Sequence, residues 1–84
     1  MPNAKTGTHR PLPEPAARSL ATALRSRREA AGLTQEDLAS TAQISVQAVR
    51  RIEAATANPT LGTLYAVATA LDVSWTELIL EVGD

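Results

Sequence analysis

The sequence QEDLASTAQISVQAVRRIE, residues 35–53, contains two short helical patterns joined by a tight turn. Leu38, Ala39 and Ala42 fall on one face of the first pattern, and Val49 begins the apolar face of the second. Ala39 is small enough to let two helices cross closely at a steep angle. The combination is typical of a helix-turn-helix, in which apolar side chains fill the angle between the helices.

The turn itself carries two signals. Ser45 is a good N-cap for the second helix, because its hydroxyl can accept a hydrogen bond from a free backbone N–H. Ile44, directly before it, is placed to fold back into the shared core. We therefore expect the chain to bend here rather than continue as one helix.

Further short motifs occur in a fixed order between residues 24 and 79. They are Leu24-Arg25 with Arg28, Gly32-Leu33-Thr34-Gln35, Leu38-Ala39, Val49 with Arg51-Ile52-Glu53, Asn58-Pro59, Ala70-Leu71, Val73-Ser74 and Glu77-Leu78. In this order and spacing they resemble the DNA-binding domain of phage repressors, Cro proteins and the xenobiotic-response-element-like bacterial regulators. The resemblance implies an all-α fold, a compact bundle of five helices with a lambda-repressor-like helix-turn-helix.

Length and composition limit the class of protein. A chain of 84 residues forms one small domain whose core is only marginally stable, so a second copy would help. Cysteine is absent and His9 is the single histidine, which excludes a disulfide framework and a Cys/His zinc site. No apolar run approaches the ~20 residues of a membrane span. We expect a cytoplasmic protein without metal or cofactor.

The charges are segregated along the chain, although the net charge is only −1. Residues 1–53 hold all eight Lys and Arg and five acids, whereas residues 54–84 hold four acids and no base. Such an asymmetry is compatible with one basic, DNA-facing side, and it also fits an ordinary solvated surface.

Residues 1–15 are interpreted as a tail, because they are rich in proline and poor in apolar side chains. The tail is either disordered, or Lys5, His9 and Arg10 form a basic arm that follows a DNA groove. Residues 16–84 are then the helix-turn-helix domain.

Two helix starts and one helix end follow from capping signals. The first helix should run from Ala16 or Ala17 to Ala31 and stop at Gly32. Thr34 with Asp37 forms a capping-box variant for the second helix. A later helix should begin with Thr60 as its cap, and its apolar stripe should consist of Leu61, Leu64, Ala68 and Leu71.

Ser74 and Glu77 predict a full capping box for the last helix, with Leu78 in the core. Trp75 allows two interpretations. It either closes the core, or it lies half exposed and forms a dimer contact with Ile79 or Leu80.

The chain departs from the family's pattern at two turns. The family usually has glycine where this sequence has Gln43 and Ala55. A left-handed conformation costs a non-glycine residue roughly 1–2 kcal/mol, so we expect these turns to be strained or to differ in shape. The loop of residues 54–58 is uncharged, whereas the family's loop is often basic.

The resemblance assigns roles to residues at matching positions. Arg28 and Glu53 are expected to form a structural ion pair that ties the first helix to the end of the recognition helix. Gln35 opens the second helix, where free N–H groups favour a DNA phosphate, and the family's glutamine often binds one there. Arg25 and Arg27 are left for solvent or phosphate.

Residues 45–53 are the expected recognition helix, whose amino-terminal residues would enter the major groove. Gln47 can pair with adenine, Arg51 with guanine, and Val46 can contact a thymine methyl. The expected base-reading residues are Ser45, Val46, Gln47 and Arg51. The expected phosphate-binding residues are Gln35, Arg50, Thr56 and Asn58.

These expectations favour a sequence-specific regulator of transcription that binds double-stranded DNA as a homodimer, a small stand-alone repressor or controller protein. Two alternatives remain open. One is the antitoxin of a toxin–antitoxin pair, and the other is a protein-interaction module that has kept the fold and lost DNA binding. An enzyme is not expected, because the sequence has no Gly-rich phosphate loop and no metal-binding cluster.

Overall fold

The computed structural model describes residues 12–82, and its side chains are described as far as residue 78. Within that range the protein is all-α, as predicted. The five helices are α2 (Glu14–Ala30), α3 (Gln35–Ala42), α4 (Val46–Glu53), α5 (Leu61–Ala70) and α6 (Trp75–Val82). Residues 1–11 of the expected tail, including Lys5, His9 and Arg10, lie outside the described residues.

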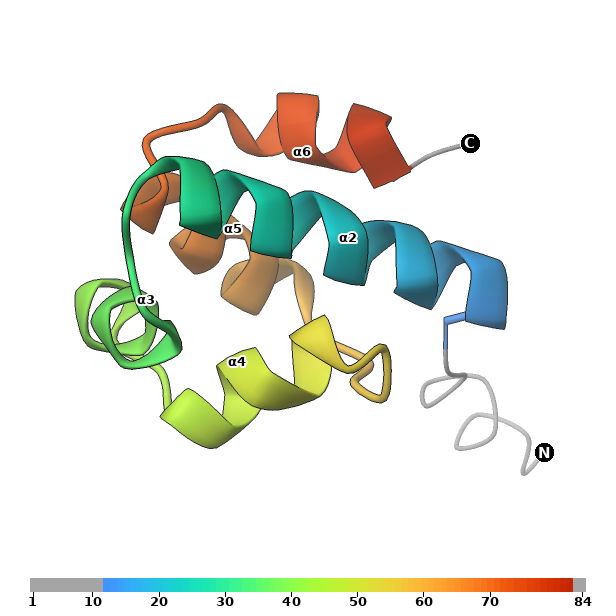
Figure 1. The fold of residues 1–84 in the computed structure, drawn as a ribbon. Coiled ribbons are helices and arrows are strands. Elements are labelled where there is room, and N and C mark those ends of the chain that lie inside the picture. The colour runs from blue at the N-terminus through green and yellow to red at the C-terminus, as the bar shows by residue number, and fades with distance from the viewer. Residues whose placement is uncertain (1–11, 83–84) are drawn as a thin grey trace, which may run out of the picture.

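The helices are arranged around α2, the longest of the five (Figure 1). α2 packs against α4 on one side and α6 on the other, while α3 packs against α4 and α5 near the carboxyl end of α2. Each helix contributes one of the large, fully buried side chains. These are Leu24, Leu38, Val49, Val67 and Leu78. Burial of each stabilises the fold by about 1.5–3 kcal/mol.

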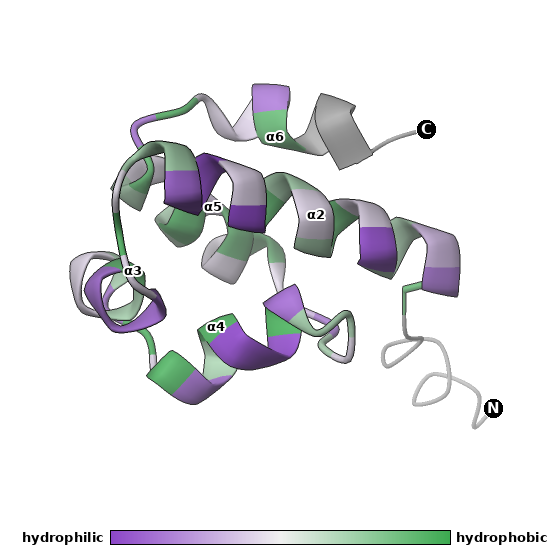
Figure 2. Ribbon diagram, in the orientation of Figure 1, coloured by the Kyte–Doolittle hydropathy of each residue, from purple (hydrophilic) through white to green (hydrophobic). Residues whose placement is uncertain are grey.

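Hydrophobic and hydrophilic residues alternate around α2 and α4, as Figure 2 shows. Val49 and Ile52 of α4 are buried beside Leu38 and Ala39 of α3, so the apolar faces predicted for the helix-turn-helix do meet in the core. The amphipathic spacing explains this packing directly, since it presents one side of each short helix to its neighbour.

The first helix begins at Glu14, two residues before the position predicted from the sequence. Pro13 is the N-cap and Pro15 lies in the first turn, where a missing N–H breaks no helical hydrogen bond. Glu14 is also favourable there, at the positive end of the helix dipole. Residues 14 and 15, which we assigned to the tail, therefore belong to α2.

The prediction for the apolar stripe of α5 was wrong at Leu61. Its side chain is 66% exposed, whereas Leu64, Val67, Ala68 and Leu71 are buried. At 100° per residue, Leu61 lies at the margin of the buried face and in the first turn, beyond the edge of the core. Helical spacing alone assigned Leu61 to the stripe, but the first turn of α5 extends beyond the helices that pack against it.

The predicted N-caps are present at three helices. The N–H of Asp37 donates to Thr34 Oγ1 at 2.9 Å, and the N–H of Thr34 donates to Asp37 Oδ2 at 3.0 Å, which completes the capping box. Ser45 and Thr60 accept from backbone N–H groups at 3.0 and 3.1 Å. For α6 the hydroxyl of Ser74 lies 2.6 Å from that of Thr76, and the box with Glu77 stays a prediction.

Helices α2 to α5 share one type of carboxyl end. In each, a residue with left-handed backbone is followed by a residue whose N–H donates to the carbonyl five positions earlier, at 3.0–3.1 Å. This is the Schellman motif. The left-handed residues are Gly32, Gln43, Ala55 and Asp72, with φ of 74, 61, 62 and 59°. Only the first is glycine, and aspartate tolerates this conformation better than most residues, so the expected strain falls on Gln43 and Ala55.

The residue after the left-handed position closes three of these ends with an apolar side chain. Leu33, Ile44 and Val73 are partly buried against the core. The expected role of Ile44 is thus confirmed. At the end of α4 the corresponding residue is Thr56, which is exposed.

Replacing Ala55 with glycine should stabilise the fold, because it removes left-handed strain of roughly 1–2 kcal/mol. Glycine also raises the conformational entropy of the unfolded chain, which offsets about 0.4–1 kcal/mol of this stabilisation. The free energy of unfolding should therefore rise by about 0.5–1 kcal/mol, or several degrees in Tm. Gln43→Gly should act in the same direction. Thermal unfolding followed by circular dichroism measures both.

The matched control is Ala54→Gly, since Ala54 is the neighbouring residue and has an ordinary φ of −89°. That variant should lower Tm. A fall in Tm for Ala55→Gly as well would show that the left-handed alanine stores no strain.

Candidate nucleic-acid interface

The outward face of α4 is polar and basic. Gln47, Arg50 and Arg51 are exposed, and Ser45 is exposed at the cap. Val46 differs from the sequence expectation in degree, because it is half-buried and packs partly against the core. Only part of its side chain faces outward.

A buried carboxylate holds α4 in place. The side chain of Glu53, the last residue of α4, is 1% exposed. It accepts two hydrogen bonds from Arg28 of α2, from Nε at 2.6 Å and from Nη2 at 3.0 Å. Arg28 also donates from Nη1 to the carbonyl of Leu33 at 2.9 Å. The pair expected from the resemblance is therefore a bidentate one, the strongest geometry for these groups.

Two further donors approach the same carboxylate. Gln35, at the start of α3, donates from Nε2 to Glu53 Oε1 at 3.0 Å, and Nε of Arg25 lies 3.6 Å from that oxygen. One carboxylate thus joins α2, α3 and α4. The sequence analysis missed the contact with Gln35. The signal for it was indirect, since a buried carboxylate has about four acceptor positions and Arg28 fills only some of them.

The environment of Glu53 lowers its pKa. Burial alone would raise the pKa, but the hydrogen bonds from Arg28 and Gln35, with the charges of Arg28 and Arg25, outweigh that effect. The carboxylate is therefore ionised at neutral pH.

The contact with Glu53 is compatible with the expected role of Gln35 in binding phosphate. A side-chain amide carries two N–H donors, and Glu53 accepts from one of them. The other donor leaves a position for a phosphate oxygen at the start of α3. Glu53 restricts the orientation of the amide, so less side-chain freedom would be lost when the amide meets a phosphate.

The other expected phosphate-binding residues lie near α4. Arg50 forms an exposed ion pair with Glu36 of α3, with 3.2 Å between Nη2 and Oε2. The hydroxyl of Thr56 donates to the carbonyl of Arg51 at 3.2 Å. Because a hydroxyl has one proton, Thr56 would have to break this bond in order to donate to a phosphate.

Arg51, Thr56 and Asn58 border one hollow of about 320 Å³ between the end of α4 and the start of α5. Thr60 and Thr63, whose hydroxyls are 3.0 Å apart, complete its polar rim. One residue predicted to read bases and two predicted to bind phosphate are thereby brought together.

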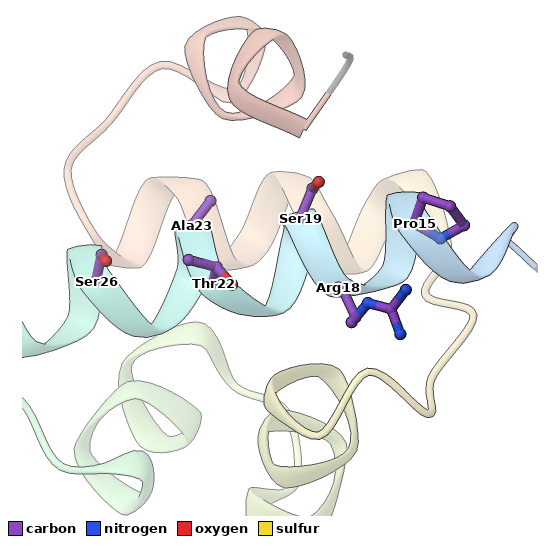
Figure 3. Close-up of a pocket in the computed structure, with 6 residues that line it drawn as sticks. All are labelled: Pro15, Arg18, Ser19, Thr22, Ala23 and Ser26. Atoms are coloured by element: carbon purple, nitrogen blue, oxygen red, sulfur yellow. The ribbon is translucent and has the colours of Figure 1, made fainter.

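A second hollow, of about 590 Å³, lies on the exposed face of α2 and is lined mostly by small side chains such as Ser19, Ala23 and Ser26 (Figure 3). Arg18 is the charged residue in its lining, and it pairs with Glu14 at 3.0 Å. This lining suggests no chemistry.

The described part of the chain contains no group of three His, Cys, Asp or Glu residues placed to hold a metal ion. Nor does any helix between residues 12 and 82 have the length and apolar character needed to cross a membrane.

Residues 24–78 match a protein-family model, HTH_3, described as helix-turn-helix. The chain belongs to the HTH_3 family. It is a small DNA-binding regulator of transcription. A search of curated proteins gave no significant match.

Solved structures of other regulators resemble this HTH_3 protein. The restriction-modification controller protein C.AhdI from Aeromonas hydrophila is 34% identical, with a TM-score of 0.72 over 74% of this chain and 94% of that one. The clp gene regulator ClgR from Corynebacterium glutamicum is 30% identical, with a TM-score of 0.76 over 83% and 76% of the two chains. The wild-type controller protein C.Esp1396I is 27% identical, with a TM-score of 0.71 over 82% and 96%.

Glu53→Gln should destabilise this HTH_3 protein by about 3–5 kcal/mol at pH 7, because it leaves the charge of Arg28 without its partner. A lowered folded-state pKa means that the carboxylate stabilises the fold above about pH 5 and loses that contribution as pH falls through the folded pKa. The difference between wild type and variant should therefore shrink from pH 7 to pH 3. Urea unfolding at several pH values measures it.

Glu14→Gln is the control, since it removes an exposed carboxylate from the pair with Arg18 and should change stability by less than 1 kcal/mol. A constant difference between wild type and Glu53→Gln at all pH values would mean that ionisation of Glu53 does not stabilise the fold.

Proposed function

We propose that this regulator binds double-stranded DNA sequence-specifically as a homodimer, with the amino-terminal part of α4 in the major groove. The observation that carries the proposal is the contrast within α4. The carboxyl-terminal residue of α4, Glu53, fixes the helix through its buried carboxylate. Gln47 and Arg51 are exposed on the outer face of the same helix. A fixed helix with exposed amide and guanidinium groups is suited to reading base edges.

The side chains of α4 would divide the reading by their chemistry. The amide of Gln47 matches adenine and the guanidinium of Arg51 matches guanine, each through two hydrogen bonds. The exposed part of Val46 would contact the methyl group of thymine, and the hydroxyl of Ser45, already accepting from the N–H of Ala48, would be a minor contact.

Residues around α4 would fix the helix on the DNA backbone. We propose that Gln35 and Arg50 bind phosphates from the two helices of the helix-turn-helix, and that Thr56 and Asn58 do so from the hollow beside Arg51. Because the loop of residues 54–58 has no charge, its contribution should depend little on salt.

The biological role proposed is that of a small repressor or controller protein. The support is the resemblance over most of both chains to C.AhdI, a restriction-modification controller protein. We propose a cytoplasmic location, as expected for a protein that binds DNA in a bacterial regulator family.

An exposed apolar surface on α5 and α6 supports the homodimer. We define it by Leu61, Tyr65 and Trp75, which are 66, 57 and 38% exposed. Tyr65 and Trp75 meet edge to face with ring centroids 6.4 Å apart, so Trp75 follows the half-exposed alternative. Expected dimer contacts of Ile79 and Leu80 lie outside the described side chains.

A second copy is the occupant that this surface fits best. α5 contains no charged residue, so a two-fold contact between the α5 helices at Leu61 and Tyr65 brings no like charges together. The small core also gains from additional apolar burial. A two-fold dimer would place two α4 helices about 34 Å apart, one turn of DNA.

Alanine at Gln47 or Arg51 should cost about 1–3 kcal/mol of binding free energy on the cognate site and relax preference at one or two base pairs. Gln35→Ala should weaken binding to cognate and scrambled duplexes alike, with little change in salt dependence. Selection of bound fragments from random DNA identifies the cognate site, and titration at several salt concentrations measures each variant.

Equal losses of affinity for both duplexes in the Gln47 and Arg51 variants would contradict base reading by α4. Unchanged affinity would do so as well, and it would favour a protein-interaction module.

Leu61→Glu should convert the dimer to a monomer, because it would bring two like charges together at the two-fold contact. Light scattering at micromolar concentration measures the mass, and circular dichroism checks that helix content is unchanged. Thr22→Glu, which places the same charge on the exposed face of α2, should remain a dimer. A dimeric Leu61→Glu protein would mean that another surface forms the interface.

A further inference from the structure

Helices α3 and α4 are joined by two polar contacts of opposite character. The contact between Gln35 and Glu53 is part of a cluster around a carboxylate that is 1% exposed. The contact between Glu36 and Arg50 is an exposed ion pair, with side chains 66 and 50% exposed. The buried contact fixes the two helices, so the exposed one is not needed to position them.

Glu36 takes no part in the cap of α3, although its charge in the first turn suits the helix dipole. The neighbouring Asp37 completes the capping box with Thr34. Glu36 is directed instead to Arg50, a cation on the proposed DNA-binding face. The helix dipole favours an acid in this turn, but beside Gln35, the proposed phosphate contact, the same charge opposes an approaching anion.

We propose that Glu36 competes with DNA phosphate for Arg50, and that this competition sets the sequence-independent part of the affinity for DNA. The inference rests on the proposed function. In the free protein Arg50 is paired with Glu36, and on DNA a phosphate takes over the guanidinium. Exposed ion pairs are weak, so the exchange is readily reversible.

Charge balance gives the expected effect on salt dependence. When Arg50 moves from Glu36 to a phosphate, one cation leaves the DNA. Glu36, now unpaired, attracts a cation in turn, so the net number of cations released is small. In Glu36→Gln the cation still leaves the DNA, but the protein takes up no cation at position 36. The slope of log affinity against log salt should then become steeper by about one.

The test compares Glu36→Gln, Arg50→Ala and the double variant with wild type on cognate and scrambled duplexes at several salt concentrations. Glu36→Gln should bind both duplexes about three- to tenfold more tightly at low salt, with the steeper slope. In the Arg50→Ala background the same change should have little effect, because the competition acts through Arg50. Thermal unfolding checks that each variant is folded.

Glu14→Gln is the matched control. It removes an acid from an ion pair of similar exposure, at the end of α2 opposite to α3 (Figure 1). Glu14 pairs with Arg18 and not with Arg50, so affinity and slope should stay near those of wild type.

Unchanged affinity and slope in Glu36→Gln would overturn the proposal. So would a full gain in the Arg50→Ala background, since Glu36 would then act directly on the DNA. The proposed function fails separately, through a wild-type protein that binds no duplex or through unchanged discrimination in the Gln47 and Arg51 variants.

Discussion

The ionised carboxylate of Glu53 is the constraint on which the arrangement of the first three described helices depends. A buried charge is costly unless it is paired and fully hydrogen-bonded, so the chain must bring donors to it. Arg28 supplies two from α2 and Gln35 supplies one from α3. A shift of any of these helices would leave the carboxylate partly unsatisfied. The orientation of α4 is thus specified by a polar contact as well as by packing.

The same contact connects the core to the surface. Gln35 has one end of its amide on Glu53 and lies at the start of α3, where backbone N–H groups are free to meet an anion. Arg25, which is 54% exposed, lies near the same carboxylate. The stability of the fold and the placement of surface donors are therefore coupled, because the residue that satisfies the buried charge is also a candidate to contact DNA.

The sequence predicted the parts of the fold that depend on neighbouring residues. The caps at Thr34, Ser45 and Thr60 and the apolar faces of α3 and α4 follow from local hydrogen bonding and helical spacing. Leu61 was misplaced because spacing does not tell where a helix extends past its neighbours. The contacts of Gln35 with Glu53 and of Arg50 with Glu36 join residues 18 and 14 positions apart, and only the crossing of the helices brings them together.

The four similar helix ends differ in how they are closed. Three of them are closed by an apolar side chain on the core, but the end of α4 is closed by the exposed Thr56 through hydrogen bonds to the carbonyl of Arg51. Ile44 secures the chain just before α4, so the segments that enter and leave this helix are held unequally. We expect local opening to begin at residues 54–58, as faster amide hydrogen exchange there than at the other three ends. Because Glu53 holds the last turn of α4 itself, such opening would free the loop of residues 54–58 to follow a DNA backbone while the helix keeps its position and register.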